Sequence, residues 1–384
     1  MHSTFIKIIL FAFFLTAALS PETYGQQRYL RKEIKRIMEE YDAVGLSVAV
    51  VKQNKIVYTH SFGLKDIALD QPLKPKNIFR IASISKSFSA TAIMQLVDAG
   101  KLSLDDDVSK LIGFAVRNPK YPDVVITLRM LLSHTSSIND SQGYFKLDVI
   151  NPAVNPDFAA CYSDYAPGEG YRYCNLNFNM VGTLLERLSG ERFDQYIVRH
   201  ILQPMHLYGG YCIDSLDNSL FATLYEYDSA TQKYNAAADA YNPRRDEIRN
   251  YKMGYSTPIF SPTGGMKISA RDLAVYMQMH MNMGVFNEKH IISPFSAEQM
   301  QTPVNRDQTY GLALMKTDTF LPGKILIGHT GLAYGLHSAM FFSPQEKFGM
   351  VLITNGCNTP DTDGWNPFLQ SVAKLLFENL IQQH

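Results

Sequence analysis

Cysteine and tryptophan are scarce in this chain, and neither sign of charge prevails. Four cysteines and one tryptophan occur among 384 residues, and 36 Lys and Arg residues are matched by 36 Asp and Glu residues. Because the formal net charge is zero, no overall field attracts the chain to nucleic acid or to an anionic membrane. We therefore expect no nucleic-acid partner, and a small molecule or a peptide as the ligand.

The apolar run near the start of the chain, residues 8–19, is too short to span a membrane. A spanning helix needs roughly 20 apolar residues, whereas this length fits the apolar region of a signal peptide. We expect residues 1–25 to be a signal peptide that is cleaved after Gly25, so that Gln26 leads the mature chain. The protein is then exported to the periplasm or secreted, with no stable membrane span. An uncleaved anchor is the alternative.

The four cysteines, Cys161, Cys174, Cys212 and Cys357, match no zinc-binding spacing, and the chain has no HExxH motif. An even number of cysteines in an exported protein allows disulfides in several pairings. Free, buried thiols are the alternative. We expect neither a metal nor a cofactor.

Strand-like segments gather at the two ends of the chain. Leu46, Val48 and Val50 alternate with smaller or polar residues, and residues 56–62 return after a polar turn as the second strand of a hairpin. Helical spacing predicts one helix over 27–40 and another over 367–381. Four further strand-like runs precede that last helix, at 310–314, 324–328, 336–342 and 348–355.

Helices and loops dominate the middle of the chain. Apolar spacing predicts one helix that begins near Ile84 and ends at Gly100, and another around Met180 that ends at Gly190. Gly100 suits a left-handed cap that terminates the first of these helices.

These patterns predict an α+β fold. The segments 26–100 and 258–384 supply an antiparallel sheet flanked by N- and C-terminal helices, and 101–257 form a mostly helical region beside it. The cleft between the two parts is the natural place for a site.

Ser83 and Lys86 are the first candidates for catalysis. Residues three apart share one face of a helix, so the amine can reach the hydroxyl. Serine is a weak nucleophile without a neighbouring base, and a desolvated lysine can lose its proton and serve as one. This spacing alone also arises by chance on surface helices.

Two further tripeptides strengthen the case. Tyr173-Cys174-Asn175 lies on an expected loop at a helix start, and His329-Thr330-Gly331 follows an apolar strand-like run. Together with Ser83 and Lys86, in this order, they resemble the three motifs of the penicillin-recognising serine hydrolases, in the branch with class C β-lactamases, D,D-peptidases and esterases. Other segments resemble the same family in the same order: 100–106, 131–136, 264–266 and 270–273.

The resemblance implies an enzyme that forms an acyl-enzyme on Ser83. Lys86 and Tyr173 would share the transfer of the serine proton to the leaving group. The backbone N–H groups of Ser83 and Leu332 would form the oxyanion hole. The resemblance also implies that no metal takes part.

Asn175, His329, Thr330 and Gly331 are implied to bind the substrate. Dedicated class C β-lactamases carry lysine where this chain has His329, and this difference counts against a β-lactamase. A histidine there carries a conditional charge, since its ordinary pKa is about 6.5.

We therefore expect a hydrolase of small amides or esters, of the D,D-peptidase, D-aminopeptidase or esterase type. A specialised β-lactamase and a non-catalytic penicillin-binding sensor are the alternatives. His134 is expected to be structural, and the pocket walls are expected from 138–165 and 214–258.

The leader interpretation makes a direct prediction. N-terminal sequencing of the protein recovered from its native host should give a start near Gln26, because the apolar run is too short to anchor stably. Intact Met1 in the membrane fraction would contradict it.

Overall fold

The computed structural model describes residues 21–305 and 309–382. Of the expected leader, residues 1–20 lie outside this range, and the last five residues begin helix α1 (Pro21–Glu40). None of the described helices combines the length and the apolar character needed to cross a membrane.

Seven antiparallel strands form the main sheet, in the order β11-β12-β13-β14-β1-β2-β3. Their bounds are β1 (Gly45–Lys52), β2 (Lys55–Asp66), β3 (Gln71–Pro72), β11 (Met315–Thr317), β12 (Leu326–Ala333), β13 (Leu336–Ser343) and β14 (Phe348–Thr354). The last strand, β14, pairs with the first, β1, along seven residue pairs from Leu46↔Thr354 to Lys52↔Phe348. The expected union of the two chain ends in one antiparallel sheet is confirmed.

Two expectations about the strands are corrected. Residues 310–314 do not form a strand, because Ala313 has a φ of 66°, which breaks the extended backbone, and β11 begins only at Met315. The tripeptide 329–331 lies inside β12 instead of at its end.

Strand β1 is buried on both faces. Leu46, Val48 and Val50 belong to one apolar core, and the intervening Ala49 and Val51 belong to the other. The alternation seen in the sequence therefore separates two cores, because helices cover the sheet on both sides.

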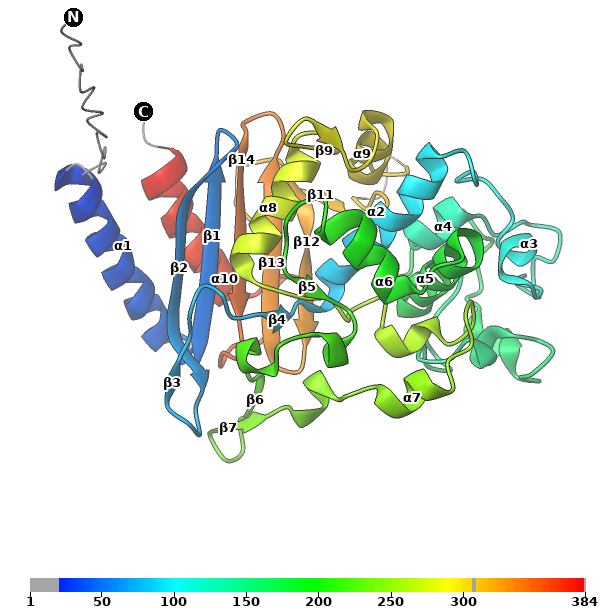
Figure 1. Cartoon of the computed structure of the whole chain (residues 1–384), viewed down its shortest axis with the longest axis horizontal. Coiled ribbons are helices and arrows are strands. Elements are labelled where there is room, and N and C mark those ends of the chain that lie inside the picture. Colours follow the sequence, from blue (N-terminus) through cyan, green and yellow to red (C-terminus); the bar gives the residue numbers. More distant parts are fainter. Residues whose placement is uncertain (1–20, 306–308, 383–384) are drawn as a thin grey trace, which may run out of the picture.

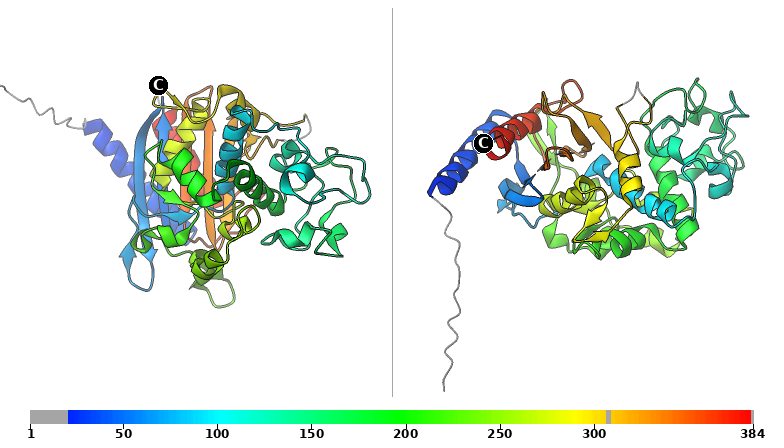
Figure 2. Two further views of the ribbon diagram at one scale, coloured as in Figure 1. Left: turned by 45° about the vertical axis from the view of Figure 1, so that its right-hand side comes forward. Right: turned by 90° about the horizontal axis from the view of Figure 1, so that it is seen from above.

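Helices α1 and α10 (Pro367–Leu376) lie side by side against one face of the sheet, and α8 (Ala270–Met281) covers the other (Figures 1 and 2). The chain continues past α10 as a π-helical turn, Phe377–Ile381. The predicted C-terminal helix is thus present, with a change of winding in its last turns.

The helical region lies beside the α8 face, on the right in Figure 1. The remaining helices are α2 (Ser85–Asp98), α3 (Val108–Ile112), α4 (Leu128–Leu132), α5 (Asn175–Ser189), α6 (Phe193–Ile197), α7 (Arg245–Arg249) and α9 (Pro294–Gln301). A small sheet joins β4 (Phe79–Arg80), β8 (Lys267–Ile268) and β5 (Gly209–Gly210), and two hairpins pair β6 (Tyr225–Asp228) with β7 (Lys233–Ala236) and β9 (Val285–Phe286) with β10 (Lys289–His290). Gly100 follows α2 with a φ of 67°, as predicted for a left-handed cap, and Gly190 ends α5 in the same way with a φ of 74°.

Glu186 on α5 ties this helix to the segment that leads toward the site. Its buried carboxylate accepts hydrogen bonds from Phe193 N at 2.7 Å, Gly254 N at 2.8 Å and Thr257 Oγ1 at 2.8 Å, and from the Tyr251 hydroxyl. Two backbone and two side-chain donors therefore depend on one acid.

Glu186→Ala should lower the free energy of unfolding by about 3–5 kcal/mol, because several buried donors lose their acceptor together. Chemical denaturation measures this loss. Glu191→Ala is the control, since the Glu191 carboxylate pairs with the side chains of Arg199 and His200 nearer the surface. Equal losses in the two variants would contradict the assigned role of Glu186.

Candidate active site

Ser83 lies in a 3₁₀ turn, Ala82–Ile84, that leads directly into α2. The preceding Ala82 has a φ of 49°, in the left-handed region that residues other than glycine seldom adopt. Strained backbone of this kind collects at functional sites, where surrounding structure holds it in place. The turn places Ser83 on the wall of a cavity of about 640 Å³.

Lys86 lies in the first turn of α2, three residues after Ser83, and is fully buried. Its Nζ atom lies 3.1 Å from Ser83 Oγ, 2.9 Å from Asn175 Oδ1 and 3.0 Å from the carbonyl oxygen of Thr263. The Asn175 and Thr263 oxygens only accept hydrogen bonds, so a neutral amine directs its two N–H bonds at them. Its lone pair then faces the Ser83 hydroxyl, which is the arrangement a general base requires.

Burial lowers the pKa of Lys86 to about 7, although the nearby Asp140 carboxylate opposes this shift. A substantial fraction of the amine is therefore neutral at physiological pH. The sequence predicted the Ser83–Lys86 pair, but it gave no sign of the third partner, Thr263.

Asp140 sets the orientation of Asn175. One carboxylate oxygen accepts from Asn175 N at 2.8 Å and from Asn175 Nδ2 at 3.0 Å, and the other accepts from Leu176 N at 3.0 Å. With Nδ2 held by the acid, Oδ1 must face Lys86. Sequence reasoning missed Asp140, because it lies 35 residues before the helix start that it caps and no local capping pattern reveals it.

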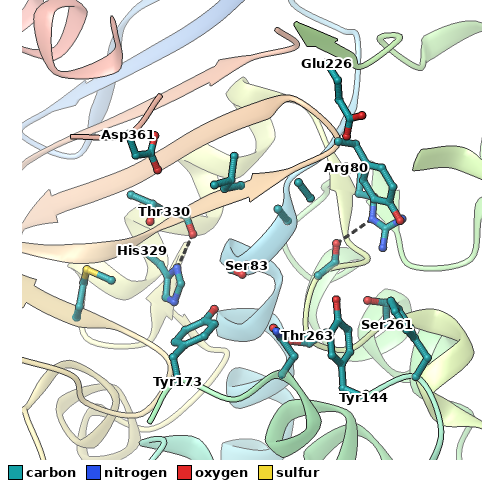
Figure 3. Close-up of a pocket in the computed structure, with 18 residues that line it drawn as sticks. Arg80, Ser83, Tyr144, Tyr173, Glu226, Ser261, Thr263, His329, Thr330 and Asp361 are labelled. Carbon is teal, nitrogen blue, oxygen red and sulfur yellow. Dashed lines mark hydrogen bonds between the residues drawn. The ribbon is translucent and has the colours of Figure 1, made fainter. Parts of the chain in front are cut away.

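Tyr173 directs its hydroxyl toward Ser83 in the cleft (Figure 3), where burial raises the pKa of the phenol above its usual range. His134 holds the backbone on both sides of Tyr173. The His134 carbonyl accepts from Arg172 N at 2.9 Å, and its Nδ1 accepts from Cys174 N at 3.1 Å. The centroids of the His134 and Tyr173 rings lie 4.3 Å apart. His134 is therefore a positioning residue for Tyr173.

His329 lines the cavity but is only 2% exposed. Its Nδ1 lies 2.5 Å from the carbonyl oxygen of Thr330, and its Nε2 lies 2.9 Å from the Tyr310 hydroxyl. A carbonyl only accepts, so Nδ1 carries the proton and Nε2 accepts from Tyr310 in a neutral ring. Burial, helped by the charge of Lys86, lowers the pKa of His329 to about 3.

Gly331 permits the close approach of β12 to the nucleophile. A Cβ atom at this position would lie 2.3 Å from the carbonyl oxygen of Ile81. Pairing of β11 with β12 ends at Gly328, so the later residues of β12, Thr330 and Leu332 among them, line the cavity. These are the positions for which the sequence predicts substrate and oxyanion binding.

The cavity walls differ in part from the sequence expectation. Tyr144 and Phe145 come from 138–165 as predicted, whereas 214–258 contribute Glu226 alone. Segment 261–264, Arg80 and Asp361 also line the cavity and were not foreseen. All four cysteines are free, buried thiols, and no three His, Cys, Asp or Glu side chains gather as metal ligands within 21–305 and 309–382.

Comparison with known proteins agrees with this geometry. The sequence model of the Beta-lactamase family matches residues 30–374. The chain belongs to the β-lactamase family. Protein flp of Staphylococcus aureus (strain N315) is 22% identical over 352 residues, which cover 87% of this chain. This chain spans only 64% of the length of that relative.

Several solved structures share the fold of this chain. The octameric penicillin-binding protein homologue from Pyrococcus abyssi aligns with a TM-score of 0.70 at 26% identity, over 92% of this chain and 77% of its own. EstCE1, described as a hydrolase with promiscuous acyltransferase activity, aligns with a TM-score of 0.71 at 21% identity, over 92% of this chain and 100% of its own. The α+β fold with an antiparallel sheet, expected from the sequence, is thereby confirmed and is of the β-lactamase/transpeptidase-like type.

Asp140→Asn should lower kcat/KM roughly tenfold, the effect of one or two weakened hydrogen bonds, and should move the acid limb of its pH profile to lower pH. Removing the anion disfavours the charged amine, so the pKa of Lys86 falls further below about 7 and the active neutral form persists at lower pH. Rates on a chromogenic ester between about pH 5 and 9 measure both effects.

The control for this variant is Asp105→Asn, which removes an exposed carboxylate paired with Arg129 at 2.9 Å. It should leave the acid limb in place. An unmoved limb in Asp140→Asn would show that Asp140 acts through the position of Asn175 and not through its charge.

Proposed function

We propose that this member of the β-lactamase family is a serine hydrolase that cleaves small esters or amides through an acyl-enzyme on Ser83. The observation that carries the proposal is the buried Lys86 amine, whose remaining partners are both acceptors and which therefore presents its lone pair to Ser83. A purely structural lysine would need no serine hydroxyl at this position.

The proposed steps follow from the contacts. Lys86 takes the Ser83 proton as Oγ bonds to the substrate carbonyl carbon, and the carbonyl oxygen becomes an oxyanion facing the N–H groups of Ser83 and Leu332. The Tyr173 phenol stays protonated, so it relays a proton from Lys86 to the leaving group as the carbon–leaving-group bond breaks. Water then attacks the acyl-enzyme, and Ser83 recovers its proton.

The neutral state of His329 bears on the substrate. D-Ala-D-Ala peptides and penicillins carry a carboxylate on the leaving side, and a neutral ring provides no charge to pair with it. We therefore favour esters or amides whose leaving group is uncharged, over a specialised β-lactamase. The likeness to EstCE1 supports acyl transfer of this kind. We also propose that the protein acts after export, as the residues before Gln26 suggest.

Ser83→Ala should abolish ester turnover and labelling by a fluorophosphonate probe, since loss of a serine nucleophile costs on the order of 10⁶ in rate. Lys86→Ala should be nearly as severe, and the two losses should not add, because the residues act as one unit. Labelling of Ser83→Ala would overturn the mechanism.

The wild-type protein separates a hydrolase from a penicillin-binding sensor. Sustained release of product from a chromogenic ester supports the hydrolase. Release of one equivalent without further turnover supports the sensor.

A further inference from the structure

Arg80 places a buried positive charge on the wall of the same cavity. It is the last residue of β4 and is 9% exposed. Its Nε donates to the carbonyl oxygen of Gly264 at 3.1 Å and its Nη1 to that of Ala240 at 3.2 Å. The ring of Tyr334 lies 4.8 Å from the guanidinium carbon. These contacts fix the plane of the guanidinium.

No carboxylate among the described residues forms an ion pair with Arg80. Both hydrogen bonds go to neutral carbonyl groups through Nε and Nη1, and no described side chain or carbonyl accepts from Nη2. Asp361, which also lines the cavity, pairs with His337 at 3.1 Å. A buried cation without a counter-charge is costly in free energy, so an anionic ligand would be bound favourably there.

The position of Arg80 indicates which part of a substrate it meets. Figure 3 shows Ser83 between two groups of side chains: Tyr173 and His329 lie on one side, and Arg80 and Tyr144 lie on the other. In the proposed reaction Tyr173 protonates the leaving group, so the leaving group occupies the Tyr173 side. The acyl group then extends toward Arg80.

We propose that Arg80 binds a carboxylate at the far end of the acyl group, so that the preferred substrates are monoesters or monoamides of dicarboxylic acids. This inference rests on the proposed hydrolase activity. The hydroxyls of Tyr144 and Ser261 line the same side of the cavity and offer further donors to the anion. Glu226, on β6, lies at this end of the cavity as well. Its negative charge opposes the binding of the substrate carboxylate.

The test compares two series of nitrophenyl esters. One series carries dicarboxylic monoacyl groups of four to seven carbons, and the other carries fatty acyl groups of the same lengths, with spontaneous hydrolysis subtracted. For at least one length the wild-type kcat/KM should favour the carboxylate ester. Arg80→Met should lower this carboxylate-to-neutral ratio about tenfold or more, and Arg80→Lys should restore part of it.

Glu226→Gln is the matched control of opposite sign, and it should leave the ratio unchanged or raise it, because it removes a like charge. A ratio unchanged by Arg80→Met in a folded protein, or no carboxylate preference in the wild type at any length, would overturn the proposal.

A measurement on the wild-type protein covers the case in which Arg80→Met does not fold. Dicarboxylate monoanions should inhibit turnover of a neutral ester competitively and more strongly than fatty acids of equal length, with an advantage that shrinks as salt is raised. Equal inhibition would count against Arg80 as the anchor. If neither ester series is turned over and Ser83 takes no label, the proposed hydrolase function itself has failed, which is a different result from a hydrolase without carboxylate preference.

Discussion

The site depends on the burial of one amine among acceptors. Lys86 has no exposed surface, and its Nζ meets oxygens from the turn before α2, from the start of α5 and from the segment before β8. Desolvation makes the neutral amine available near pH 7, and the acceptor atoms orient its lone pair. The same contacts hold three separate parts of the chain together, so a displacement of any of them alters both the geometry and the basicity of the site.

Polar residues of the helical region keep this amine in place. Asp140 fixes the orientation of the Asn175 side-chain amide. His134 accepts hydrogen bonds from the backbone on both sides of Tyr173. Glu186 anchors the C-terminal end of α5 to the segment before Thr263. The carboxylates of Asp140 and Glu186 each accept several hydrogen bonds, which offset the cost of removing them from water. The helical region thus acts as a rigid support that the sheet alone could not provide.

Charge is distributed unevenly across the cleft. The position that carries a lysine in class C β-lactamases holds a neutral, buried histidine, His329, on the leaving-group side. The unpaired cation, Arg80, lies on the opposite side of Ser83. Selectivity among acyl compounds is therefore expected to arise from the acyl side, because a charge in a buried site discriminates strongly between ionic and neutral groups.

Local patterns in the sequence were sufficient to predict strands β1, β13 and β14, the glycine cap of α2, and the proximity of Ser83 and Lys86. Each of these depends on residues close in the chain. Only the tertiary structure decided the role of Asp140, the neutral state of His329 and the lack of a carboxylate counter-charge to Arg80 among the described residues. Desolvation and pairing depend on groups brought together from distant parts of the chain, such as Tyr310 beside His329. No spacing rule records such contacts, so the motif residues could be located from the sequence, while the electrostatics of the cleft required the fold.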